Sequence, residues 1–228
     1  MYKNVRAIDT TIHKDNYVKE TENYTYAKEI IHVPLILSEF YIACKDYPIV
    51  FAKDTKNNSW FATVILGFKE KENLFINEDG NWEKNKYVPA YIRRYPFVLL
   101  ENTDTEQYTL AIEESYLTEE KNDRKLFEEN EKSEYLNNVL GFLTQFNDNA
   151  KATNLFIKQL EDWELLEEKR ISIVTPNKEE FHINGFYVIN EEKLSHLSKK
   201  KKEEICDKNA NSLITAHLIS LSNIQRIF

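Results

Sequence analysis

The stretch Trp82–Phe97 gathers more side chains suited to binding or chemistry than any other part of this chain. It reads WEKNKYVPAYIRRYPF and places aromatic rings beside an Arg-Arg pair. Arginine forks suit carboxylates and phosphates, and tyrosines suit partly wet interfaces. The pattern therefore predicts a site for an anion or a peptide. The alternative is a structural corner in which the tyrosines pack and the arginines pair with carboxylates. The candidate binding residues are Trp82, Tyr87, Tyr91, Arg93, Arg94 and Tyr95.

Glu39 is the one further candidate, because it lies between Leu37 and Phe40 in an otherwise apolar segment. A buried carboxylate needs a cationic partner or it takes up a proton. Arg93 or Arg94 is the expected partner. The pair is interpreted as a structural salt bridge, with a catalytic acid as the alternative.

The remaining chemistry-bearing residues form no recognisable motif, so no catalytic residue, metal site or cofactor is predicted. The five histidines lie at positions 13, 32, 182, 196 and 217, without the paired spacing of metal ligands. His217 lies on an apolar helical face and is expected to be a buried, hydrogen-bonded core residue. With four glycines in the whole chain, there is no glycine-rich phosphate loop.

The composition and charge of the chain limit the kinds of partner and the cellular compartment that we expect. The chain has 228 residues, 42% of them hydrophobic, and a formal net charge of -8. An acidic balance argues against nucleic acid as a partner. The lysine run Lys199–Lys202 is followed by Glu203 and Glu204, which is typical of a solvated helix face.

Two distant cysteines, Cys44 and Cys206, indicate neither a disulfide framework nor a metal motif, and favour a reducing compartment. The N-terminus lacks the apolar segment of a signal peptide, and the apolar runs are too short to span a bilayer. We therefore expect a soluble, cytoplasmic protein without membrane insertion. Export without a signal peptide is the alternative.

Proline residues bound the elements that position the candidate residues. Pro89 favours a helix start and Pro96 a helix end, with Phe97–Leu100 following as a buried strand. Prolines bound the earlier segment in the same way. A predicted helix begins at Val33-Pro34 and ends at Tyr47-Pro48, before two strands. The chain therefore contains two helix-and-hairpin modules, which could share a sheet.

The rest of the chain alternates between strands and helices by its hydrophobic periodicity. The pattern predicts a strand at Asn73–Ile76, hairpins around the turns Asn102–Asp104 and Pro176–Lys178, and helices at Tyr135–Phe146 and Leu155–Trp163 separated by a break at Asn147–Asn149. It also predicts a helix from Glu191 through the lysine run and a final helix, Ser212–Phe228.

These elements predict an α+β fold: a mostly antiparallel sheet of five to seven strands with helices packed around it. The predicted domain organisation is an N-terminal arm, residues 1–30, and one α+β domain, residues 31–228, with a helical insertion at residues 123–165.

The central stretch also resembles the signature of the SapC family of bacterial proteins. The resemblance rests on Asp79-Gly80-Asn81-Trp82 and on Tyr87–Phe97. It extends from residue 30 to the end of the chain through weaker matches at Val33–Leu35, Glu39, Tyr47–Phe51, Asn73–Phe75, Gly185–Tyr187, Glu191, Leu194 and Ala216–Leu221. The insertion Glu83–Lys86 lengthens the gap between Trp82 and Tyr87 relative to the family pattern.

The resemblance implies an intracellular accessory or binding protein with a protein or peptide partner, linked to the production or export of surface-layer proteins. It supplies no catalytic residues. The alternative is an enzyme that acts on a peptide or glycan at a site near Trp82–Tyr95. A buried arginine and tyrosine corner with an apolar surface patch elsewhere would favour the binding protein, whereas an exposed concave site with a deep pocket would favour the enzyme.

Overall fold

The computed structural model describes residues 1–21, 23–56, 58–102, 107–174, 178, 180–207 and 210–226. Internal contacts divide the chain into two compact units, which are described separately below. Unit 1 comprises Met1–Tyr24 and Ala90–Asp148, and unit 2 comprises Thr25–Pro89 and Asn149–Phe228. The division between Pro89 and Ala90 cuts through the stretch Trp82–Phe97.

Unit 1 is built on a three-stranded antiparallel sheet with the order β1-β7-β6. These strands are β1 (Val5–Ala7), β6 (Phe97–Asn102) and β7 (Gln107–Glu113). Two small antiparallel pairs join β2 (Tyr17–Val18) to β8 (Leu117–Thr118) and β9 (Phe127–Glu128) to β10 (Glu131–Lys132). The short helices are α1 (Thr10–His13), α3 (Ala90–Arg93) and the 3-10 turn η3 (Glu114–Tyr116).

The core of unit 1 is an apolar cluster on this sheet, to which the long helix α4 (Glu134–Asp162) contributes its first half. The buried members are Val18, Phe97, Leu110, Ile112, Leu126, Phe127, Leu136 and Leu143.

Unit 2 is built on a five-stranded sheet with the order β11-β12-β4-β5-β3, in which every pairing is antiparallel. The strands are β3 (His32–Leu35), β4 (Ile49–Asp54), β5 (Ser59–Ile65), β11 (Leu166–Val174) and β12 (Glu180–Ile189). Val50, Ile65, Phe186 and Val188 form a buried cluster on these strands.

The helices of unit 2 include α2 (Phe40–Ala43), α5 (Glu191–Ser195), α6 (Lys199–Asp207) and α7 (Ala210–Ser220). Its 3-10 turns are η1 (Thr25–Ala27), η2 (Leu37–Glu39) and η4 (Leu221–Gln225). The predicted α+β class with antiparallel sheets and a helical block near residues 133–165 is therefore confirmed. Among the described residues, no helix is long and apolar enough to cross a membrane.

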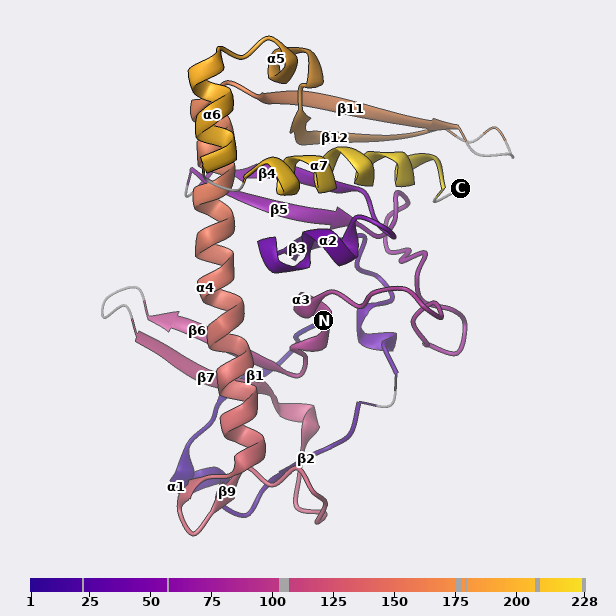
Figure 1. Cartoon of the computed structure of the whole chain (residues 1–228). Coiled ribbons are helices and arrows are strands. Elements are labelled where there is room, and N and C mark those ends of the chain that lie inside the picture. Colours follow the sequence, from indigo (N-terminus) through magenta and orange to yellow (C-terminus); the bar gives the residue numbers. More distant parts are fainter. Residues whose placement is uncertain are drawn as a thin grey trace. The chain divides into compact units, whose positions relative to one another are not determined.

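The predicted break at Asn147–Asn149 is wrong, because α4 continues through these residues as one helix (Figure 1). Asparagine and aspartate in a helix interior each cost less than about 0.7 kcal/mol relative to alanine. Apolar side chains on both sides of the three residues, including Phe146 and Ile157, are buried along the same helix. Packing therefore outweighs the local propensity.

The two predicted modules do not share a sheet. Strands β4 and β5 belong to the five-stranded sheet, whereas β6 and β7 belong to the three-stranded sheet. Val33-Pro34 also forms part of strand β3 instead of opening a helix. Strand β3 is at the edge of its sheet, where a proline does not remove a needed ladder hydrogen bond.

Other predicted elements differ in detail. Asn73–Ile76 is a turn with one isolated bridge from Ile76 to Trp82 instead of a strand. The helix predicted through the lysine run is interrupted between α5 and α6. The final helix gives way to η4 after Ser220. Several predicted turn or terminal residues lie outside the described residues: Thr103, Asp104, Pro176, Asn177 and Phe228.

Candidate functional site

The candidate residues are distributed over the two units. Glu39, Trp82 and Tyr87 belong to unit 2, whereas Tyr91 and the segment Arg93–Tyr95 belong to unit 1. Each half of the predicted site is therefore built from its own unit.

In unit 2, Tyr47 connects Trp82 and Tyr87 through its hydroxyl group. The Trp82 Nε1–H donates to the Tyr47 oxygen at 3.0 Å, and the Tyr47 hydroxyl donates to the Tyr87 carbonyl. Phe75 packs against both rings, with its centroid 4.6 Å from that of Tyr47 and 6.4 Å from that of Trp82. Tyr47 is 0% exposed, and burial raises the pKa of its phenol. The phenol therefore stays protonated and acts as a structural donor.

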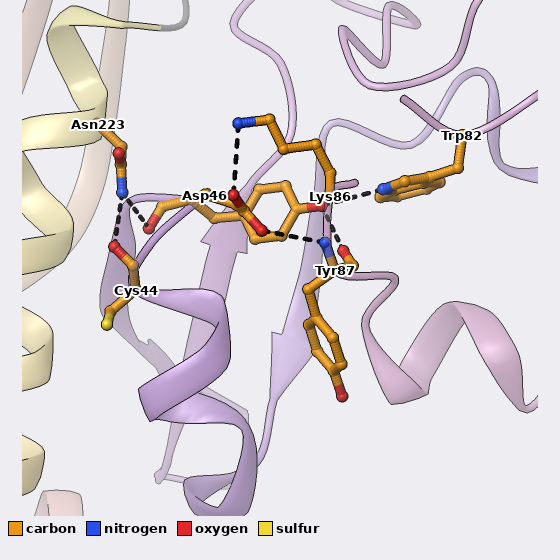
Figure 2. Close-up of polar contacts among 7 residues, drawn as sticks. Cys44, Asp46, Trp82, Lys86, Tyr87 and Asn223 are labelled. Carbon is orange, nitrogen blue, oxygen red and sulfur yellow. Dashed lines mark hydrogen bonds and ion pairs between the residues drawn. The ribbon is translucent and has the colours of Figure 1, made fainter. Parts of the chain in front are cut away.

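Asp46, next to Tyr47, fixes the segment that carries Tyr87. Its carboxylate accepts the Tyr87 backbone N–H at 3.0 Å and lies 3.3 Å from the Lys86 Nζ (Figure 2). Asn223 of η4 fixes the backbone around Asp46, because its side-chain amide donates to the carbonyls of Cys44 and Tyr47 at 2.8 and 3.2 Å. Three separate parts of unit 2 therefore meet around Asp46 and Tyr47.

Glu39 is buried, with 3% of its surface exposed, and it is hydrogen-bonded within unit 2. It accepts the Ile36 backbone N–H at 3.2 Å and the Tyr87 hydroxyl at 2.7 Å. Figure 2 shows the Tyr87 ring directed away from Asp46, so Tyr87 bonds Asp46 with its backbone and Glu39 with its side chain.

The ion pair between Glu39 and Arg93 or Arg94 stays a prediction, because the arginines belong to unit 1. Its measurement is a double-mutant cycle that combines Glu39→Gln with Arg93→Met and, separately, with Arg94→Met. Additive effects of the single changes in both cycles would rule the pair out.

In unit 1, aromatic rings surround the half-buried guanidinium of Arg94. Its central carbon lies 3.9 Å from the ring centroid of Tyr91, 5.4 Å from that of Phe146 and 5.9 Å from that of Tyr2. Its buried Nε has no hydrogen-bond partner in the described part of the chain. Burial raises the pKa of Tyr2 to about 12, although the Arg94 charge acts in the opposite direction. Such cation–π packing stabilises the charge of Arg94.

Tyr95 and Arg93 flank this cluster and differ in exposure. Tyr95 is 8% exposed and packs against Tyr2 and Tyr116, with centroid distances of 5.3 and 5.0 Å. Burial raises its pKa. Arg93 is exposed and lies 5.4 Å from the Phe142 ring centroid.

Glu113 was not a candidate from the sequence, yet it is 4% exposed and anchors the N-terminal segment. It accepts the backbone N–H groups of Lys3 at 2.7 Å and Asn4 at 3.0 Å. The Tyr2 hydroxyl donates to the Phe97 carbonyl at 2.6 Å. The N-terminal residues thus contribute to the aromatic cluster around Arg94 in unit 1.

A small polar pocket of about 150 Å³ lies beside Asp46 in unit 2. Its cationic lining residues are Lys45, Lys86 and Arg226, and its acidic ones are Asp46 and Glu83. Phe75 and Asn223, both buried, also line it.

A larger and more open pocket of about 620 Å³ lies against α2 and α7. Tyr41 and Ile219, which line it, are 53% and 56% exposed, and the adjacent Ile42 is 42% exposed. Cys44 and Cys206 both line this pocket as free thiols, although they are far apart in the sequence. We refer to the exposed residues Tyr41, Ile42 and Ile219 as the apolar patch.

Sequence reasoning missed Tyr47, Asp46 and Asn223 as organisers of the site. The sequence marks Tyr47 as the end of a predicted helix before Pro48 and as part of a weak family match, but not as a site residue. A tyrosine, an aspartate and an asparagine so far from their partners in sequence give no local signal. His217 is buried, as predicted, and its Nε2 accepts the Ile189 N–H at 3.1 Å. In the described part of the chain, no cluster of three or more His, Cys, Asp or Glu residues could hold a metal ion.

A family model described as SapC matches residues 8–227, nearly the whole chain. No curated protein and no solved structure matches the chain.

Proposed function

The chain belongs to the SapC family, and we propose that it is an accessory protein that binds a peptide or protein partner through the apolar patch on α2 and α7. The observation that carries the proposal is the exposure of Tyr41 and Ile219, which line a pocket of about 620 Å³, and of the next residue in the sequence, Ile42. Contiguous exposed apolar side chains with a polar rim are typical of protein interaction sites. The pocket supplies such a rim through Asn211, Ser212 and Thr215.

The packing of the aromatic stretch supports the same role. Trp82 and Tyr95 are each 8% exposed, and Glu39 is 3% exposed. The carboxylate of Glu39 is engaged by Ile36 and Tyr87, which suits a structural role better than a catalytic acid. These contacts favour the binding protein over an enzyme acting on a peptide or glycan near Trp82–Tyr95.

The partner that we propose is a surface-layer protein before its export, which places the accessory protein inside the cell. The free thiol of the exposed Cys206 is compatible with a reducing compartment. Fractionation of cells followed by immunodetection should find the protein in the cytoplasm. Recovery of most of it, uncleaved, from the cell surface would contradict this location.

The binding role is tested with the double variant Tyr41→Ser and Ile219→Ser. Binding of the purified chain to the unfolded surface-layer protein of the same organism is measured by isothermal titration calorimetry. We expect about tenfold weaker binding or more, because two exposed apolar anchors are lost.

Leu155→Ser is the matched control, because Leu155 is 68% exposed in unit 2 and does not line the pocket. It should bind the partner as tightly as the unmodified chain. Equal affinity of the double variant and the control would contradict the proposed binding surface.

A further inference from the structure

The small pocket beside Asp46 is lined by more positively than negatively charged side chains. Lys45, Lys86 and Arg226 line it together with the two carboxylates of Asp46 and Glu83. In the described part of the chain, neither Lys45 nor Arg226 makes an ion pair. The pocket therefore has a cationic excess and two cations that remain available.

Asp46 adds little repulsion toward an entering anion, because both of its oxygens are already engaged. One accepts the Tyr87 N–H at 3.0 Å, and the other lies 3.3 Å from the Lys86 Nζ. Its side chain is 14% exposed. The carboxylate thus orients Lys86 at the pocket and fixes the segment that bears it.

The pocket is preformed, because buried contacts hold its walls. Asn223, which is 2% exposed, ties η4 to the carbonyls of Cys44 and Tyr47, and so positions the chain on either side of Lys45 and Asp46 (Figure 2). Phe75, which is 6% exposed, packs on Tyr47 and supplies an apolar wall. An apolar wall strengthens charge interactions by lowering the local dielectric.

We propose that this pocket binds a small oxyanion, either a carboxylate or a phosphate group. The guanidinium of Arg226 offers the planar fork that suits both groups, and the ammonium groups of Lys45 and Lys86 offer point charges. A volume of about 150 Å³ accommodates one such group and a short chain. Glu83 opposes the anion and limits its affinity.

The experiment titrates inorganic phosphate and, separately, succinate into the full chain at constant ionic strength. The readout is tryptophan fluorescence, because the Trp82 ring stacks on the pocket residue Phe75. We expect a saturable change with at least one anion. Saturation with phosphate alone identifies a phosphate group, and saturation with succinate alone identifies a carboxylate.

Two variants test the charges. Lys45→Gln combined with Arg226→Gln should weaken binding by about tenfold or more, whereas Glu83→Gln should strengthen it. Lys200→Gln on α6 is the control and should leave binding unchanged, because Lys200 is exposed and does not line this pocket. The proposal would be overturned if neither anion gave a saturable change. It would also be overturned if the double variant of Lys45 and Arg226 bound the anion as tightly as the unmodified chain.

Discussion

Tyr47 joins separate parts of unit 2 through one hydroxyl group. Replacing Tyr47 with Phe removes the acceptor of the Trp82 Nε1–H and the donor to the Tyr87 carbonyl, while keeping the ring packed on Phe75. Removing a partner from buried polar groups costs about 1–3 kcal/mol. We expect the free energy of unfolding in urea to fall by that amount.

Tyr41→Phe is the control for this change. The Tyr41 hydroxyl contacts the Ser212 Oγ at 2.8 Å, but Tyr41 is 53% exposed, so water replaces the lost contact. Its effect on stability should be within about 0.5 kcal/mol. Equal losses in the Tyr47 and Tyr41 variants would show that the buried junction is no more important than a surface contact.

His217 should make stability depend on pH. It is 0% exposed, and burial lowers its pKa to about 3. In the unfolded chain it takes up a proton near its ordinary pKa of about 6.5, so below that pH the unfolded state binds more protons. The histidine's contribution to stability is therefore complete above the unfolded pKa and is lost as pH falls from about 6.5 to 3.

His217→Leu should keep the fold and flatten this pH dependence by up to about 1.4 kcal/mol per pH unit. Urea unfolding at several pH values between about 7 and 4 measures the slope over the range in which the histidine titrates. His196→Gln, at an exposed position, provides the comparison. Identical slopes for the unmodified chain and the His217→Leu variant would contradict the assignment of His217 as a buried neutral residue.

The sequence indicates the burial of His217 but not the role of Tyr47, for a physical reason. The helical periodicity around His217 is local, so its burial could be predicted. Trp82 and Tyr87 drew attention as aromatic residues beside prolines, but their partner Tyr47 lies 35 and 40 positions away. Hydrogen bonds between such distant segments depend on the tertiary fold and leave no spacing pattern in the chain.

At the scale of the elements, α4 shows how packing overrides a local signal. Asp148 lies between two asparagines, so its carboxylate competes for backbone groups and favours a break. The helix nevertheless continues, because side chains before and after this point, such as Leu143 and Leu160, are buried. The sequence alone could not show that both halves of the pattern find a core to pack against.

Substitutions at Asp148 test the continuity of α4. Asp148→Ala should stabilise the protein by up to about 0.7 kcal/mol, whereas Asp148→Pro should destabilise it by about 3 kcal/mol or more. Circular dichroism during urea unfolding measures both. A proline that costs less than about 1 kcal/mol would show that the helix is already broken at this position.

At the scale of the whole molecule, α4 contributes to both units. Its first half places Leu136 and Leu143 in the core of unit 1. Its second half belongs to unit 2, where the Asn154 side chain donates to the Trp60 carbonyl at 2.8 Å and Glu161 accepts the Trp60 Nε1–H at 2.8 Å. Helix formation is cooperative, so unfolding of one half removes hydrogen bonds at the start of the other.

A core substitution in unit 1 should therefore also shift the unfolding transition that is measured by the tryptophan fluorescence of unit 2. The three tryptophans, Trp60, Trp82 and Trp163, all lie in unit 2, so their fluorescence reports on that unit alone. Leu126→Ala, at a 0% exposed position of unit 1, should cost about 2–5 kcal/mol. Because α4 is shared, we expect the urea midpoints by fluorescence and by circular dichroism to fall together.

Ile12→Ala, at a 66% exposed position of unit 1, should change neither midpoint. A fluorescence midpoint that stays unchanged while the dichroism curve splits into two steps would show that the units unfold independently.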